Sequence, residues 1–306
     1  MGQVFDEIPG NLIPWILAQK LFWVATAPLA EDGHVNVSPK GCFDKTLNII
    51  REERGADGKE PNARAVWYED FTGSGVETIS HLYENGRITM MFVAFEGPPQ
   101  IIRLYGTGKV YEYGTPEYAK LLPSEQRQPG SRAAIWIDVH RVSTSCGFSI
   151  PFFEYKAPRI KLHKVAMTFE QNELDPPADD SAQEVAGFKL DKSMKAMWRI
   201  MNLKSIDGLP GLAYAFDSPE PLTNWKKDPK GIEYRAMKDD ESVSKPKLSQ
   251  VKARSEADAK PISPSPSSSK MDMAFGIAFG VLIGIFASRQ WESRVLPMLC
   301  AYLQWS

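Results

Sequence analysis

Short apolar runs, each ended by Gly, Pro or Asn, recur through the first half of the chain and predict β-strands more than helices. Residues 21–26 form one run, residues 34–38 alternate between apolar and polar side chains, and the Pro- and Gly-containing stretch between them predicts a hairpin loop. The remaining runs cover residues 65–68, 88–94, 101–105, 106–111 and 133–139. A series of short strands punctuated in this way is typical of an antiparallel barrel and disfavours a parallel α/β sheet.

Two segments show the helical repeat instead. Residues 76–85 place their apolar side chains on one stripe, and residues 190–201 do the same in the later half of the chain. The stripes consist of Val76, Ile79, Leu82 and Tyr83, and of Leu190, Met194, Met197, Trp198 and Met201. We therefore expect a mainly β fold with a few helices, of the α+β class.

The composition changes twice after residue 235. Residues 236–270 contain no aromatic side chain and are rich in Ser, Pro, Lys, Glu and Asp, so they have too little apolar surface to offset the entropy of ordering. This stretch is expected to be a disordered linker. Residues 271–306 then become apolar again.

The apolar segment after the linker predicts a transmembrane helix over residues 271–290, with a short tail over 291–306. Met271–Ser288 contains 18 residues with Asp272 as its one charge, and Gly276, Gly280 and Gly284 repeat at every fourth position. Eighteen helical residues span about 27 Å, slightly less than the hydrocarbon core of a membrane. A buried core helix is the alternative, but the linker separates this segment from the domain that would bury it.

More Lys and Arg precede this segment than follow it, so the N-terminal domain is expected on the cytosolic side of the membrane. The sequence does not distinguish the endoplasmic reticulum from the mitochondrial outer membrane. In the whole chain, 36 Lys and Arg stand against 38 Asp and Glu, a net charge of −2 that disfavours a non-specific grip on nucleic acid. The three Cys and four His are scattered, which predicts neither a disulfide framework nor a metal site.

The most informative local segment is the glycine-containing turn that joins a predicted strand to the helix at residue 76. Gly73 and Gly75 would let a phosphate approach the backbone at the start of the helix, and Thr72, Ser74 and Thr78 would offer hydroxyl donors. The alternative is a capping box, because Ser74 and Glu77 also have the S-x-x-E spacing that caps a helix. The turn matches neither the Walker A nor the G-x-G-x-x-G pattern.

A second candidate lies at the end of the predicted strand that contains Ser38 and Lys40. Lys40 is suited to pair with an anion, although an exposed lysine at a strand end is the simpler interpretation. No Ser-His-Asp order, HExxH motif or carboxylate pair indicates an acid–base mechanism, so no catalytic residue is assigned. Cys146 precedes Gly147, and we expect it to be a small buried side chain rather than a redox group.

Several segments together resemble the pyridoxamine-phosphate oxidase-like family. They occur in order over roughly residues 5–215 and comprise residues 22–29, 32–41, 68–82, 84–89, 95–99, 103–108, 144–148 and 205–210. The resemblance implies an FMN-binding split β-barrel over residues 1–155, with a helical extension over 156–235 packed on it, and usually a homodimer with the flavin at the subunit interface. It places Ser38 and Lys40 beside the flavin or its phosphate.

The same resemblance puts the FMN phosphate at the turn formed by Thr72, Gly73, Ser74, Gly75 and Thr78. The true oxidase has a Ser-Arg-Lys cluster at that turn and a C-terminal Arg/His substrate motif, and this chain has neither. Oxidation of vitamin B6 is therefore not expected, and a cofactor other than FMN stays open. Two functions follow: an FMN-dependent oxidoreductase acting on a small-molecule substrate, or a non-catalytic module that holds flavin or another planar cofactor at a membrane.

Overall fold

The computed structural model of the protein describes residues 2–41, 46–51, 60–176, 183–185, 188–190 and 193–238. All of these residues belong to the first of two compact units, Met1–Glu241. The predicted linker after residue 238, the predicted transmembrane helix at 271–290 and the tail at 291–306 lie outside the described residues. None of the helices within the described ranges combines the length and apolar character needed to cross a membrane.

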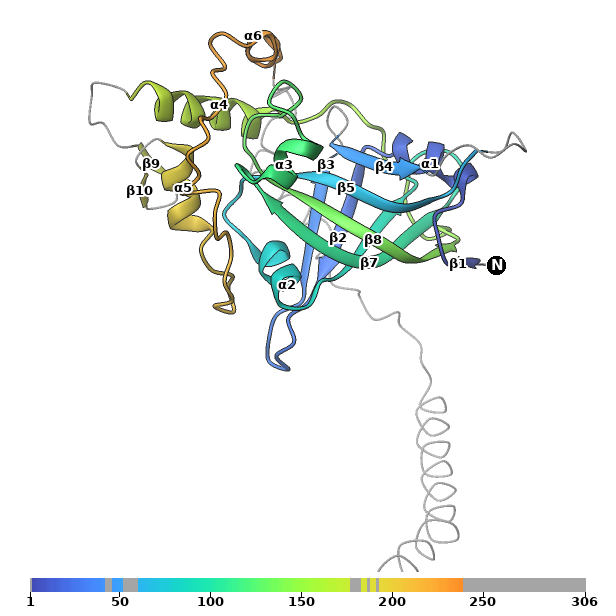
Figure 1. Ribbon diagram of the computed structural model, residues 1–306. Coiled ribbons are helices and arrows are strands. Elements are labelled where there is room, and N and C mark those ends of the chain that lie inside the picture. The colour runs from blue at the N-terminus through green and yellow to red at the C-terminus, as the bar shows by residue number, and fades with distance from the viewer. Residues whose placement is uncertain are drawn as a thin grey trace, which may run out of the picture. The chain divides into compact units, whose positions relative to one another are not determined.

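The first unit is built on one antiparallel sheet, which Figure 1 shows as a strongly curved layer. The strands run in the order β3-β2-β6-β7-β8-β5-β4, and β1 pairs with the far end of β8. The strands are β1 (Val4–Phe5), β2 (Leu21–Thr26), β3 (Asn36–Gly41), β4 (Leu47–Arg51), β5 (Ala63–Phe71), β6 (Arg87–Val93), β7 (Ile101–Glu112) and β8 (Ser131–Ser145). An antiparallel sheet with a few helices is consistent with a split barrel, and β3 and β4 are its two edges.

Alternation along the strands separates the inside of this sheet from the outside. In β2 every second residue is buried, and Phe22 and Val24 lie directly opposite Lys40 and Ser38 of β3. Residues that pair across antiparallel strands point to the same face, so these two polar side chains of β3 share the inner face with the core of β2. The edge strand β3 thus places Ser38 and Lys40 on the inner face, at the edge of the sheet.

The helices surround the sheet (Figure 1), and a separate two-stranded ribbon joins β9 (Gln183–Val185) to β10 (Phe188–Leu190). The helical elements are a 3₁₀ turn at Gly10–Leu12, α1 (Ile13–Ala18), α2 (Glu77–Asn85), α3 (Pro116–Leu121), α4 (Lys161–Leu174), α5 (Met194–Met201) and α6 (Pro229–Ala236). The helix predicted at 76–85 is α2, which ends at Gly86 with a left-handed φ of +70°. The helix predicted at 190–201 begins later, because Leu190 lies in β10 and Ser193 caps α5 by accepting a bond from the Ala196 N–H.

Two further expectations need correction. Residues 101–105 and 106–111 form the single strand β7, in which Gly106 marks a register shift against β8 instead of a strand end. Cys146 is exposed, not buried.

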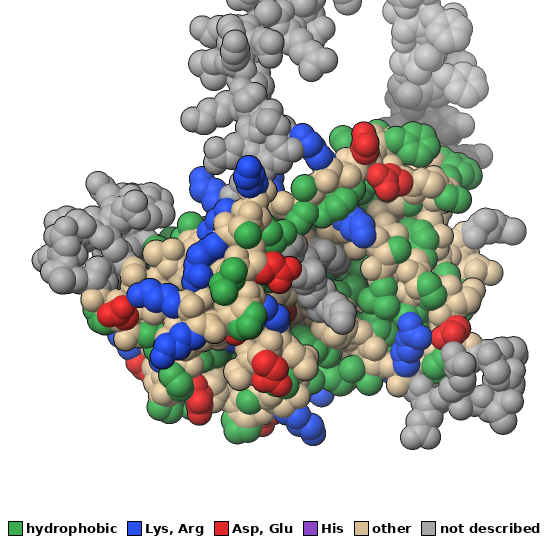
Figure 2. Space-filling view, turned by 90° about the horizontal axis from the view of Figure 1, so that it is seen from above, with side chains coloured by type: hydrophobic (Ala, Val, Ile, Leu, Met, Phe, Trp, Pro, Cys, Tyr) green, Lys and Arg blue, Asp and Glu red, His purple; other side chains and the backbone are tan. Residues whose placement is uncertain are grey.

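Figure 2 shows that Lys and Arg side chains gather on one half of the face seen from above, with acidic and apolar side chains among them, so this face carries charges of both signs.

Candidate functional site

A pocket of about 380 Å³ lies between the edge strand β3 and the turn that leads from β5 into α2. This volume is within the range of roughly 300–1,000 Å³ that small-molecule and cofactor sites occupy. All seven residues that the sequence selected line this one pocket: Ser38, Lys40, Thr72, Gly73, Ser74, Gly75 and Thr78. The fold therefore brings the two candidate segments of the sequence together.

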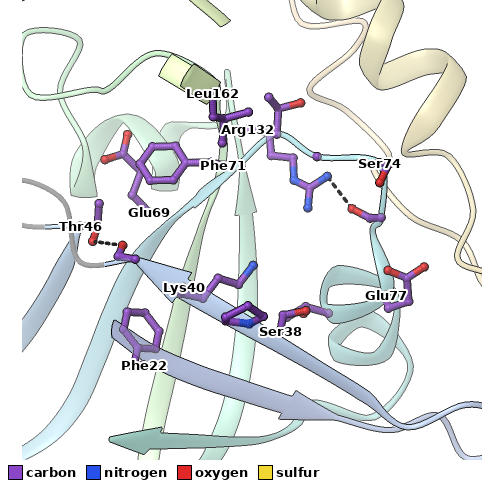
Figure 3. Close-up of a pocket in the computed structure, with 16 residues that line it drawn as sticks. Phe22, Ser38, Lys40, Thr46, Glu69, Phe71, Ser74, Glu77, Arg132 and Leu162 are labelled. Carbon is purple, nitrogen blue, oxygen red and sulfur yellow. Dashed lines mark hydrogen bonds between the residues drawn. The ribbon is translucent and has the colours of Figure 1, made fainter. Parts of the chain in front are cut away.

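A buried ion-paired cluster forms the polar end of the pocket. Lys40 Nζ lies 2.7 Å from Asp70 Oδ1, and Arg132 Nε lies 2.9 Å from Asp70 Oδ2. Figure 3 shows Lys40 and Arg132 reaching into the same space from β3 and β8. Burial alone would raise the pKa of Asp70, but the two cations outweigh it and hold this pKa below its ordinary value. The anion that Lys40 pairs with is thus the protein's own carboxylate.

Arg132 keeps part of its hydrogen-bonding capacity for the pocket. Its side chain is 5% exposed; Nε donates to Asp70 and Nη1 donates to the Gly75 carbonyl at 2.9 Å. Nη2 makes no bond to any residue that the structure describes. Nη2 is not among the fully enclosed polar atoms without a partner, so it is open to the pocket and can donate to a ligand acceptor there.

The pocket hydroxyl groups of Ser38 on β3 and Thr78 on α2 belong to one hydrogen-bond network. Asn36 donates from Nδ2 to Thr26 Oγ1 at 3.1 Å and to Thr78 Oγ1 at 3.0 Å, and its Oδ1 accepts from Ser38 Oγ at 3.0 Å. Thr26 Oγ1 also lies 2.9 Å from His81 Nδ1. Burial lowers the pKa of His81, so its imidazole is neutral where it hydrogen-bonds with Thr26. Ser38 and Thr78 are thereby fixed in orientation.

The glycine turn is held in place from the opposite side by α5. Trp198 Nε1 donates to Thr72 Oγ1 at 3.1 Å, and Asn202 Nδ2 donates to the Gly73 carbonyl at 2.9 Å. Trp198 and Asn202 are both fully buried. The Thr72 hydroxyl is therefore occupied by the helical segment, whereas Ser74 is exposed at the pocket.

The capping-box alternative for Ser74 is wrong. Helix α2 begins at Glu77, and its N-cap residue is Val76, which carries no polar side-chain atom. Because Ser74 stands outside the cap position, it cannot satisfy the first helical N–H groups in the way that the S-x-x-E spacing suggested.

Apolar and acidic side chains complete the walls. Phe22, Phe71 and Leu162 line the pocket on the side away from the turn (Figure 3). Glu69 also lines it, and both its carboxylate oxygens accept bonds from Gln128, at 2.9 Å and 3.1 Å. Burial raises the pKa of Glu69, more than these hydrogen bonds lower it.

Sequence reasoning missed Asp70, Arg132 and Glu77 as site residues. Asp70 and Arg132 are charged residues within or next to predicted buried strands, and β5 pairs Asp70 with Ala133, the neighbour of Arg132. A charged residue at the end of an apolar strand could have indicated a site. The pairing of β5 with β8, which brings Asp70 close to Arg132, cannot be predicted from either strand alone. In the described ranges, no group of three or more His, Cys, Asp or Glu is placed to hold a metal ion.

Comparison with known proteins identifies the family. The pyridoxamine 5′-phosphate oxidase family protein ustO of Aspergillus flavus is 34% identical over 232 residues, which cover 72% of this chain and 84% of that protein. The chain belongs to the pyridoxamine 5′-phosphate oxidase family. Membership confirms the resemblance found in the sequence. No family model matches the chain.

Solved structures similar to this family member cover less of the chain. HupZ of Group A Streptococcus is 23% identical and covers 44% of this chain and 91% of its own, with a TM-score of 0.33. A protein of Clostridium acetobutylicum related to general stress protein 26 is 15% identical, covering 45% of this chain and 91% of its own, with a TM-score of 0.28. The FAD binding protein of Mycobacterium smegmatis is 10% identical, covering 47% and 97%, with a TM-score of 0.29.

Proposed function

We propose that this pocket binds a flavin, with FMN as the form implied by the family, and that the protein is an oxidoreductase acting on a small molecule. The observation that carries the proposal is the buried Arg132, whose Nη2 is unpartnered at the polar end of a cofactor-sized pocket. Family membership supports the same function, since the relative ustO carries the family's name.

The residues present fit a flavin in their chemistry. Lys40 and Arg132 supply charged donors for carbonyl or phosphate oxygens, and the fixed Ser38 and Thr78 hydroxyls line the pocket from β3 and α2. Phe22 and Phe71 offer apolar surface to a planar ring system. A bound flavin supplies hydride and one-electron transfer, and the protein supplies binding and orientation.

No side chain in the pocket is assigned to proton transfer. Asp70 is held ionised by two cations, and Glu69 is engaged by Gln128. Both carboxylates therefore act in binding and in fixing the walls. A substrate would enter beside the flavin through the open side near the exposed Ser74.

Two parts of the proposal concern assembly and location. The protein is proposed to be a homodimer. Its apolar segment Met271–Ser288 is proposed to anchor it in a membrane, with the N-terminal domain on the cytosolic side.

If the flavin is not reduced by any substrate or electron donor, the second candidate function applies. It is a non-catalytic module that keeps flavin, or another planar cofactor, at that membrane.

The first test is the absorption spectrum of the purified full chain, followed by titration with FMN. We expect flavin bands, and we expect the Lys40→Ala variant to bind FMN about tenfold more weakly, because a hydrogen bond to a charged group is lost. The matched control is Lys109→Ala, since Lys109 also pairs with a carboxylate, Asp138, at 2.8 Å, but on the surface. Bleaching of the flavin bands by NAD(P)H would support the oxidoreductase.

A protein that neither purifies with a flavin nor binds added FMN or riboflavin would contradict the proposal. Equal affinity for FMN in Lys40→Ala and Lys109→Ala would place the flavin elsewhere. Flavin binding without reduction by NAD(P)H or other electron donors would favour the non-catalytic module.

A further inference from the structure

The anion position of the glycine turn is already occupied by a carboxylate of the protein itself. Glu77 stands in the first turn of α2 and lines the pocket. Its Oε2 lies so close to Gly75 that a Cβ at residue 75 would collide with it. The glycine therefore makes room for this carboxylate, and the N-terminal end of the helix stabilises it.

The Glu77 carboxylate is held there by the later part of the chain. Its Oε1 accepts a hydrogen bond from the Ile206 N–H at 3.3 Å. The two cations of the pocket, Lys40 and Arg132, both pair with Asp70, and Glu77 forms no ion pair with any residue in the described ranges. Its negative charge thus faces the turn without a cationic partner.

The charges that line the pocket around the turn limit which ligand group can bind there. The lining contains the cations Lys40 and Arg132, both paired with the buried Asp70 behind them, and the carboxyl groups of Glu69 and Glu77. A phosphate group, with a charge of about −1.5 to −2 at neutral pH, would add negative charge without compensation and would meet Glu77 at the turn. The negative charges of the phosphate and of Glu77 would repel each other, and this repulsion disfavours phosphate binding.

We propose that Glu77 is a specificity-determining residue that lowers the affinity of this pocket for phosphate. The pocket then binds the ring and ribityl part of a flavin and gains little from the 5′-phosphate. The ligand class is a flavin irrespective of its phosphate, and the inference rests on the proposed flavin site.

The first test needs no flavin and uses inorganic phosphate as the probe. In Glu77→Gln the amide oxygen still accepts from Ile206 N–H, but the charge is gone. We expect isothermal titration of the full chain to show phosphate binding about tenfold tighter to this variant than to the wild type. The control is Glu84→Gln, because Glu84 lies on the same helix and also accepts a backbone N–H, that of Leu29, at 2.8 Å.

The second test compares FMN with riboflavin, which differ only in the phosphate. The wild type should bind both with dissociation constants within about threefold, and Glu77→Gln should bind FMN about tenfold tighter with riboflavin unchanged. Equal FMN affinity in the wild type and Glu77→Gln, or tighter phosphate binding by Glu84→Gln as well, would overturn the role of Glu77. If neither flavin binds any variant, the flavin site is refuted, and the phosphate titration still decides whether Glu77 excludes anions.

Discussion

Asp70 is the residue on which the polar end of the pocket depends. It is fully buried and joins Lys40 of β3 to Arg132 of β8, two strands that do not pair with each other. A buried ion pair adds little to stability over an apolar replacement, but removal of one partner leaves an uncompensated charge. At this position two cations would lose their partner together.

We therefore expect Asp70→Asn to lower the free energy of unfolding by about 3 kcal/mol or more. Urea denaturation followed by fluorescence measures this loss. The control is Asp217→Asn, because Asp217 forms an exposed pair with Arg199 that contributes less than about 1 kcal/mol. A loss in Asp70→Asn no larger than in this control would show that the cluster is not a structural unit.

The same residue gives a pH dependence with a definite sign. The folded-state pKa of Asp70 is depressed, so its contribution to stability is complete above the unfolded-state pKa of about 4 and is lost as the pH falls through the lower, folded-state pKa. The unfolding free energy of the wild type should thus fall more steeply below about pH 4 than that of Asp70→Asn. Parallel acid titrations of the two proteins compare these slopes.

Helices with a regular apolar stripe were predictable, even in α2, where Thr78, Ser80 and His81 are also buried. The stripe of α5 is visible in the sequence because Met194 and Trp198 are buried at helical spacing. Helix α4 lies within the helical extension expected over residues 156–235, but its position was not predicted, because its buried side includes His163 and Glu170, whose polar character interrupts the apolar repeat. Tertiary partners that compensate such groups cannot be identified within the helix itself.

The compensating partners of Glu170 lie in two other segments, the loop before β8 and the loop before α6. Its carboxylate accepts from Arg127 Nη1 and Nη2 at 2.7 Å and 2.8 Å, from Gly130 N–H at 2.7 Å and from Trp225 Nε1 at 2.7 Å. Arg127 is 1% exposed, and its guanidinium lies 4.7 Å from the centre of the Tyr113 ring. Glu170 therefore ties α4 to the loop before β8 and to the loop before α6.

Neutralising this carboxylate should loosen the helical segment. We expect Glu170→Gln to reduce the free energy of unfolding by about 3–5 kcal/mol, because Arg127 is left buried without a counter-ion. Asp175→Asn is the matched control at the C-cap of the same helix, since Asp175 forms an exposed pair with Lys226 and its replacement should cost less than about 1 kcal/mol. Thermal and urea unfolding would contradict the expectation if both variants lost the same small amount.

The candidate site was predictable to the extent that it depends on local chain segments. Gly73, Ser74 and Gly75 stand out because glycines precede a helix, and Lys40 because it ends a strand. That both segments line one pocket follows from β3 being a sheet edge beside the β5–α2 turn, which is a property of strand order. Strand order depends on long-range pairing, and the apolar pattern of single strands does not encode it.

At the scale of the whole molecule, the surface after β8 carries an unusual aromatic patch. Phe148, Phe152 and Phe153 are 84%, 80% and 60% exposed. The Phe153 ring lies 5.3 Å from that of Phe95, and the Phe153 N–H donates to the Phe95 carbonyl at 3.1 Å. Phe153 is thus held against the loop between β6 and β7, and exposed aromatic clusters of this kind mark interaction surfaces.

We propose that the occupant of this patch is a second copy of the chain, in line with the homodimer implied by the family resemblance. The double variant Phe148→Ser/Phe152→Ser should then shift the full chain in mild detergent from dimer toward monomer, because it removes the most exposed apolar area. Sedimentation equilibrium over a range of protein concentrations measures the change. The expected weakening is about tenfold or more in the dimer dissociation constant.

The control for this variant is Ile232→Ser, which removes an apolar side chain that is 62% exposed on α6, an element outside the patch. It should leave the dimer unchanged, so a general effect of surface polarity is separated from loss of the interface. A wild-type chain that sediments as a monomer at every concentration would refute the dimer. A wild-type dimer that both variants leave intact would place the interface on another face, since two exposed Phe side chains at an interface centre cannot be replaced by Ser without loss of affinity.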